Sequence, residues 1–152
     1  MAPAVDAARY GGFWIRFAAV VIDAIVLTIA LMPVYLVVFA GVAGAGYAVG
    51  MPWSGRHLVA RIGGRGLFFF AGWLYEALMW SSSRQATLGK MILHLRVTDL
   101  DRNTVSFARA SGRHFAKYLS AFLLFIGYIM AAFTARHQAL HDMMAGTVVR
   151  QD

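Results

Sequence analysis

Residues 17–40 read FAAVVIDAIVLTIALMPVYLVVFA, and they indicate which class of protein this is. The run holds 24 residues with one charged side chain, Asp23, and one proline, Pro33. About 20 predominantly apolar residues let an α-helix cross the roughly 30 Å hydrocarbon core of a bilayer. We therefore predict a transmembrane helix over residues 17–40.

The composition of the whole chain supports a membrane protein. Of its 152 residues, 60% are hydrophobic and only 14% are charged, with a mean hydropathy of +0.62. Soluble domains have roughly 25% charged residues. The absence of cysteine excludes a disulfide scaffold and a thiolate metal site. We predict one all-α integral membrane domain covering residues 1–152.

Two further apolar runs predict two more spans, over residues 62–83 and 115–134. The second span is short, and its aromatic side chains Trp73, Tyr75 and Trp80 are of the kind that lies near a membrane interface. The third run contains Gly127, which leaves open a re-entrant pair of short helices in place of a full span.

The segment between these two runs has a different pattern. Apolar and polar residues alternate from Met91 to Thr98, and turn residues follow at 99–103, which predicts a short cytoplasmic β-hairpin at about 90–105. Ser106 is positioned to cap an amphipathic helix lying at the membrane interface. The polar edge of that helix would consist of Arg109, Arg113 and Lys117.

The distribution of charge predicts the orientation and the lipid contacts. The chain has a net charge of +7, and residues 84–117 carry seven Arg and Lys against two acids. The positive-inside rule places this segment and the N-terminus in the cytoplasm, next to anionic headgroups of the bilayer. The basic residues lie beside apolar runs and form no nucleic-acid-reading pattern, so we expect no nucleic-acid partner.

Four ionisable residues near the predicted spans are candidate functional residues: Arg16, Asp23, Glu76 and Asp142. Arg16 and Asp23 are seven residues apart, which separates them by roughly 10 Å along a helix axis. They cannot pair directly, so we predict that Arg16 pairs with Asp142, or with Asp23 of a neighbouring helix or protomer. Glu76 is either functional or merely solvated at the interface.

The sequence shows no constellation that indicates an enzyme. His137 and His141 have the i, i+4 spacing of metal ligands, but no third ligand accompanies them. No nucleophile, base and acid stand at recognisable spacings. We therefore expect no catalytic activity, no cofactor and no metal site.

Three separated motifs occur in a recognisable order. Arg16 and Ile22-Asp23 are followed by Thr87-Leu88-Gly89-Lys90 with residues 95–99 (LRVTD), and then by residues 140–149 (LHDMMAGTVV). Together they resemble the RDD family, named for an arginine and two aspartates that correspond here to Arg16, Asp23 and Asp142. Glu76 is not part of that motif. The similarity extends over residues 12–149.

The resemblance implies a multi-pass protein of the bacterial inner membrane, for which exchange of Na⁺, Li⁺ or K⁺ against protons has been proposed in some members. Asp23 and Asp142 would then bind the proton or cation, with Arg16 as counter-charge. Three spans are too few to enclose a transport path, so such an antiporter would be a homo-oligomer, at least a dimer. The alternative is a non-catalytic accessory subunit of a larger membrane complex.

Overall fold

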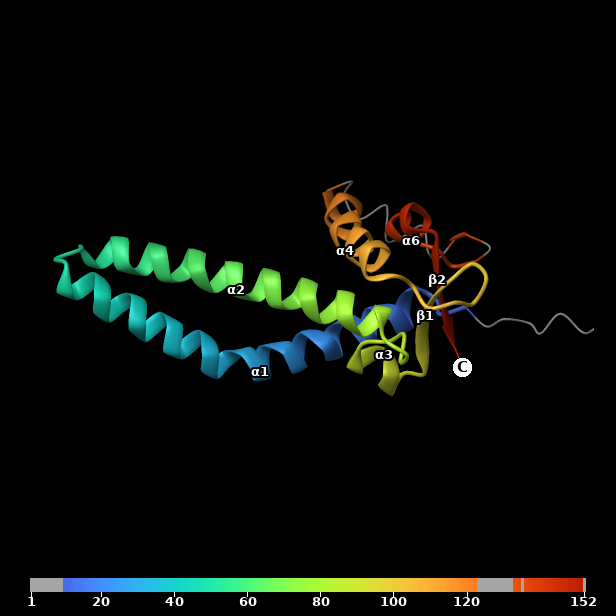
Figure 1. Cartoon of the computed structure of the whole chain (residues 1–152), viewed down its shortest axis with the longest axis horizontal. Helices are drawn as coiled ribbons and strands as arrows, with labels where there is room; N and C mark the ends of the chain where they lie inside the picture. The colour runs from blue at the N-terminus through green and yellow to red at the C-terminus, as the bar shows by residue number, and fades with distance from the viewer. Residues whose placement is uncertain (1–9, 123–132, 135, 152) are drawn as a thin grey trace, which may run out of the picture. The chain divides into compact units, whose positions relative to one another are not determined.

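The structure, a computed structural model, describes residues 10–122, 133–134 and 136–151. The elements in chain order are α1 (Phe13–Ala48), α2 (Trp53–Ser81), α3 (Leu88–Ile92), β1 (Leu95–Asp99), α4 (Phe107–Phe122), α6 (Leu140–Ala145) and β2 (Thr147–Gln151) (Figure 1). The chain divides into two compact units. Unit 1 comprises the described residues up to Asp23 and those from Leu74 onward, and unit 2 is the helical hairpin Ala24–Trp73.

The helix predicted over residues 17–40 is confirmed as the central part of α1. Among the described residues, α1 is the one helix that is long and apolar enough to cross a membrane, and its most apolar window is not buried inside the protein. Side chains such as Ile29 and Val37 are 70% and 73% exposed. Exposed apolar surface on this scale is suited to lipid contact.

The other two predicted spans differ from the observed helices. Residues 62–83 fall largely in α2, which already begins at Trp53 and carries Arg56, Arg61 and Arg65 in its first half. The predicted span 115–134 begins inside α4, which ends at Phe122, and residues 123–132 of that span lie outside the described part. The count of three spans is therefore not confirmed.

The predicted β-hairpin at 90–105 is wrong in its pairing. Residues 88–92 form the helix α3, and β1 pairs antiparallel with β2 from the other end of the chain, with Val97 opposite Val149. Within 90–105 there is only an isolated bridge between Thr98 and Thr104, across the expected turn. The pairing of β1 with β2 is favoured because it buries apolar side chains of both strands. Those at most 2% exposed are Leu95, Val97, Val148 and Val149. Pairing of Thr98 with Thr104 alone would leave most of them exposed.

The helix predicted after Ser106 is confirmed as α4, with the Arg109 N–H donating to Ser106 Oγ at 3.3 Å. The prediction that its three basic residues form a polar edge at the membrane interface is wrong for two of them. Arg109 is exposed and donates to the carbonyls of Ala145 and Gly146, but Arg113 and Lys117 are buried in unit 1. Their charges face acidic side chains of the protein, which offset part of the cost of burying a cation.

Candidate functional site

Seven of the buried or half-buried ionisable side chains of unit 1 form what we call the buried charge cluster: Arg16, Asp23, Glu76, Lys90, Arg113, Lys117 and Asp142. They come from α1, α2, α3, α4 and α6. Asp142 is 0% exposed, Arg113 2% and Lys90 4%. Burying a charge is costly unless it is paired or hydrogen-bonded, so each member has to be explained by its contacts.

Asp142 lies in the first turn of α6 and accepts bonds from three elements. Arg113 of α4 donates to Oδ1 from Nε at 2.8 Å and from Nη2 at 2.5 Å. Arg16 of α1 forms a salt bridge with Oδ2 through Nη1, and the Ala139 N–H donates to Oδ2 at 3.2 Å. This carboxylate therefore holds α1, α4 and α6 together.

The two arginines share one carboxylate. Arg16 also donates from Nε to the Gly11 carbonyl at 2.6 Å. Arg16 Nη2 and Arg113 Nη1 are buried without a hydrogen-bond partner among the described residues. Burial would raise the pKa of Asp142, but Arg113 and Arg16 outweigh it and hold that pKa below its usual range. Asp142 is consequently an ionised structural anion at neutral pH.

Asp23 has a different set of partners, at the start of α3. Thr87 Oγ1 donates to Asp23 Oδ2 at 2.6 Å, and the Gly89 N–H donates to Oδ1 at 2.8 Å. Tyr75 Oη donates to Oδ1 at 2.9 Å and accepts the Leu88 N–H at 2.8 Å. The carboxylate of one helix thus supplies the N-terminal cap of another, where free N–H groups favour an anion.

The contacts of Gly89 explain why a glycine occupies this position. A Cβ at this position would overlap the carbonyl oxygen of Ala19 and lie 3.0 Å from Asp23 Cγ. Only a residue without a side chain lets α3 approach the backbone of α1 closely enough for the Asp23 bond. The sequence Thr87-Leu88-Gly89-Lys90 is therefore a docking motif for Asp23.

Glu76 joins α2 to α4. Lys117 Nζ lies 2.5 Å from Glu76 Oε1 and 2.6 Å from Oε2, and His114 Nδ1 lies 2.7 Å from Oε2. The side chain of Glu76 is 15% exposed. Glu76 is therefore an internal anion with a lysine partner and not a residue solvated at the interface.

Trp80 lies at the centre of the buried charge cluster and is 0% exposed. Its ring faces three cations, with Arg113 Cζ at 4.4 Å, Lys117 Nζ at 4.5 Å and Lys90 Nζ at 5.1 Å from the centroid. These distances are within the range of cation–π attraction. The Trp80 ring thus offsets part of the repulsion among these three cations.

Lys90 is the member with the weakest pairing. Within the described part of the chain its ammonium makes no hydrogen bond or salt bridge, and it lies 5.1 Å from the centroid of the Trp80 ring. Burial lowers the pKa of Lys90 to about 7, and Lys117 and Arg113 lower it as well, whereas Glu76 and Asp23 raise it. Lys90 is therefore a group that changes charge near neutral pH.

His141 is a neutral member of the same region. Its Nδ1 lies 3.3 Å from Ser120 Oγ and its Nε2 lies 3.6 Å from Asp142 Oδ1. Burial lowers the pKa of His141 to about 3, although Asp142 raises it. Among the residues that the structure describes, no group of three His, Asp or Glu side chains could hold a metal ion.

Comparison of the sequence with known proteins places the chain in a family. The sequence pattern of the RDD family matches residues 10–146. The chain belongs to the RDD family. It is 35% identical over 147 residues to the protein YxaI of Bacillus subtilis (strain 168), covering 91% of this chain and 95% of that protein. It is also 30% identical over 151 residues to the membrane protein YteJ of the same organism, covering 92% and 80%. No solved structure matches.

In this RDD chain, the signature residues form two centres and not one. Arg16 and Asp142 are in contact within one chain, which is one of the two pairings expected from the sequence. Asp23 instead holds α3 through Thr87 and Gly89. The arginine and the two aspartates thus tie together the start of α1, α3 and the C-terminal segment.

Sequence reasoning missed Lys90 and His114, and it assigned Arg113, Lys117 and Trp80 to the membrane interface and not to the interior of unit 1. The available signal was Glu76, an acidic residue in an apolar run without a local partner. The residues Arg113 and Lys117 are an i, i+4 pair of cations on one face of α4, and because such like charges repel each other, they favour nearby acidic partners. A search for their partners would have suggested Glu76 and Asp142.

Proposed function

We propose that this RDD-family chain is a non-catalytic accessory protein of the bacterial inner membrane. In this proposal α1 anchors the chain as part of a multi-pass protein, and unit 1 docks onto a larger membrane complex from the cytoplasm. The basic character of residues 84–117 supports the cytoplasmic orientation, because positively charged segments stay on that side. The N-terminus would lie on the same side.

The observation that carries this proposal is that each of the three carboxylates is hydrogen-bonded to side chains or backbone of other helices or of the segments before them. Asp142 binds two guanidiniums, Glu76 binds a lysine and a histidine, and Asp23 accepts three hydrogen bonds. A carboxylate that exchanges Na⁺ for a proton needs free lone pairs toward a solvated path. All three instead have partners that fix one helix to another, which is a structural role.

Exchange of monovalent cations for protons is the second candidate, and Lys90 favours it. This buried ammonium has a pKa of about 7 and the carboxylate of Asp23 nearby raises that value. Loss of the Lys90 proton would leave Asp23 with less positive charge around it, which favours an incoming cation. This candidate function requires a homo-oligomer, because so few helices cannot enclose a path.

One experiment separates the two candidates. The purified protein in liposomes containing a pH-sensitive dye receives pulses of Na⁺, K⁺ and Li⁺, together with the variants Asp23→Asn and Lys90→Met. Asp101→Asn, an exposed carboxylate change, is the matched control. The accessory proposal expects no cation-driven pH change in any of these proteins, and migration of the native protein in a complex of fixed composition.

A pH change in the wild type and the control that disappears in Asp23→Asn would overturn the accessory proposal and establish exchange. If Lys90→Met also abolishes it, Lys90 is the proton carrier. Both variants are checked for an unchanged oligomeric state, so that loss of exchange is not confused with loss of folding.

A further inference from the structure

The charged residues of unit 2 have no role in either candidate function. Residues 24–73 contain three arginines and no aspartate, glutamate or lysine. An arginine that projects from an apolar helix hairpin without an acidic partner needs another source of negative charge or direct access to water.

Arg56 is accounted for by contacts within unit 2. Its guanidinium lies 5.5 Å from the ring centroids of both Tyr47 and Trp53, and its stem packs so closely on Gly46 that a Cβ there would lie 2.6 Å from Arg56 Cγ. Aromatic rings thus hold this arginine at the turn of the hairpin.

Arg61 and Arg65 have no such partners. They are one helical turn apart on α2, so they share one face, and both are exposed. Within residues 24–73, which are described in full, neither guanidinium makes a hydrogen bond, a salt bridge or a cation–π contact. They are therefore available to an external anion.

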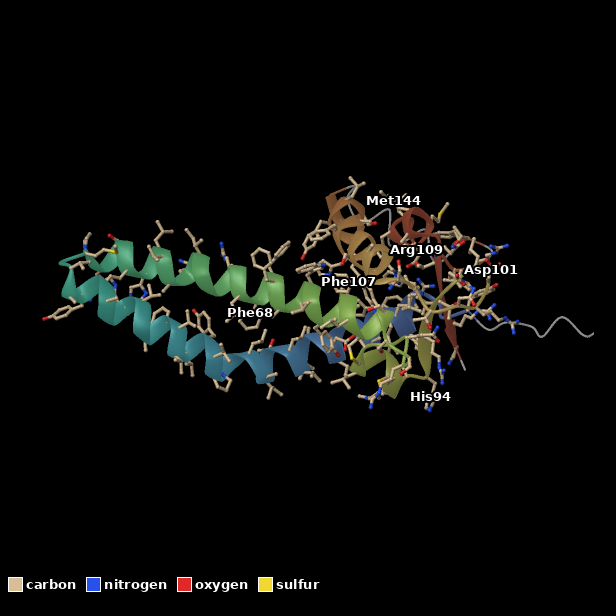
Figure 2. The ribbon with its side chains drawn as sticks, in the orientation of Figure 1. Phe68, His94, Asp101, Phe107, Arg109 and Met144 are labelled. Carbon is tan, nitrogen blue, oxygen red and sulfur yellow. The ribbon has the colours of Figure 1, made fainter. Side chains whose placement is uncertain are left out.

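The two guanidiniums border a cavity of about 370 Å³, whose other lining residues are Tyr35, Gly64 and Phe68. Tyr35 of α1 packs directly on Gly64, where a Cβ would overlap the tyrosine ring. Phe68 points from α2 toward α1, and its ring centroid lies 6.3 Å from that of Tyr35 (Figure 2). The lining of the cavity thus combines two aromatic rings with two cations.

The surroundings of this cavity are apolar. Leu36, Val37, Ile62 and Phe70 are between 56% and 73% exposed on the neighbouring turns. Tyr35 lies five residues before the end of the apolar run 17–40, close to where a span of that length reaches the headgroup region. An anionic phospholipid matches both features, because its phosphate can face Arg61 and Arg65 and its acyl chains can contact the apolar surface.

We infer that Arg61 and Arg65, with Tyr35 and Phe68, form a binding site for the phosphate of an anionic phospholipid. The planar guanidinium of arginine can donate two parallel hydrogen bonds to the oxygens of one phosphate. Basic pockets between membrane helices bind anionic headgroups. The acyl chains would extend from this site toward the bilayer centre, along exposed apolar side chains such as Ile29 of α1 and Phe70 of α2. The site rests on the insertion of α1 and α2 in the membrane and is independent of the accessory role.

The test uses the full-length protein, purified and delipidated in detergent, and measures its melting temperature during titration with phosphatidylglycerol. Phosphatidylcholine and inorganic phosphate are titrated in parallel. For the wild type we expect a rise in melting temperature that is clearly larger with phosphatidylglycerol. The double change Arg61→Gln with Arg65→Gln should weaken the apparent affinity at least about tenfold, because it removes two charge-assisted contacts.

The matched control is Arg84→Gln, which removes an exposed arginine of unit 1 and should leave the response unchanged. If the double variant does not fold, the single variants Arg61→Gln and Arg65→Gln are used, and each should weaken the response several-fold. Three results would overturn the inference: an unchanged response in the glutamine variants, an equal response to phosphatidylcholine, or an equal response to inorganic phosphate. The last result would assign the cavity to a soluble anion. Since no ion gradient is involved, none of these results depends on the liposome exchange experiment.

Discussion

Asp142 is the residue on which the packing of unit 1 depends most. Replacement by asparagine keeps its size but leaves Arg16 and Arg113 buried without a counter-charge. Removal of one partner of a buried ion pair costs about 3–5 kcal/mol. We therefore expect Asp142→Asn to lower the free energy of unfolding in detergent by this amount, as measured by denaturant titration.

Asp101→Asn is the control for this prediction, because Asp101 is exposed and forms no salt bridge with a described residue (Figure 2). It should change stability by less than about 0.5 kcal/mol. Equal stability of the two variants would mean that Asp142 does not hold α1, α4 and α6 together.

Lys90 gives a prediction about pH. Its pKa is about 7 in the folded protein and 10.5 in the reference state, so between these values the unfolded chain binds more protons than the folded one. The stability contributed by this site therefore rises as pH increases from 7 toward 10, and below pH 7 the full cost of burying the ammonium is present. Lys90→Met removes that cost.

We expect Lys90→Met to be more stable than the wild type at pH 6, with a difference that shrinks as pH rises toward 9. Melting temperatures measured at several pH values check this, with Arg102→Met as a control at an exposed cation. A difference that is independent of pH would show that the effect of Lys90→Met is packing and not charge.

At the scale of elements, the position of α3 depends on its contact with α1 at Gly89. Gly89→Ala places a methyl group against the Ala19 carbonyl and forces α3 away from Asp23. Overpacking of this kind costs about 1–3 kcal/mol, before the loss of the Asp23 hydrogen bond is added. We expect a corresponding fall in the free energy of unfolding.

Gly112→Ala is the matched control, since a Cβ at that position of α4 meets nothing within 4 Å. Alanine stabilises a helix interior by roughly 0.5–1 kcal/mol relative to glycine. The two substitutions should therefore have opposite signs. If both stabilise the protein, α3 does not require the close approach to α1.

Local signals in the sequence predicted some elements and not others. The run 17–40 and the cap at Ser106 predicted α1 and α4 because both depend on neighbouring residues only. The pairing of β1 with β2 was missed because β2 has only five residues and lies about fifty residues further along the chain. It also begins immediately after Gly146, the C-cap of α6. Strand pairing over such a separation depends on tertiary packing, which no local pattern records.

The buried charge cluster shows the same limit. An amphipathic pattern on α4 identifies the face that carries Arg113 and Lys117, but it does not say whether that face meets water or acidic side chains. The pairing of Arg16 with Asp142 could be predicted because few acids remained as partners near the membrane. Asp23 had no such constraint, since its partners are a hydroxyl, a phenol and a backbone N–H.

For the whole molecule, the contacts within unit 1 constrain the topology. Arg16 at the start of α1 touches Asp142, and β1 pairs with β2, so all of these residues lie on one side of the membrane. Three complete spans would place Asp142 on the side opposite to Arg16. We therefore predict an even number of membrane crossings between Arg16 and Asp142.

Cysteine substitution tests this topology directly, because the chain has no cysteine of its own. We replace Val49 at the hairpin turn, Asp101 in the loop after β1 and Gln151 at the end of β2, all of which are exposed. In intact cells an impermeant thiol reagent should label only Val49→Cys. Permeabilised cells should allow labelling at all three positions, which shows that each thiol is reactive. Labelling of Gln151→Cys but not Asp101→Cys in intact cells would separate the two strands by a membrane and refute the β1–β2 pairing together with the even number of crossings.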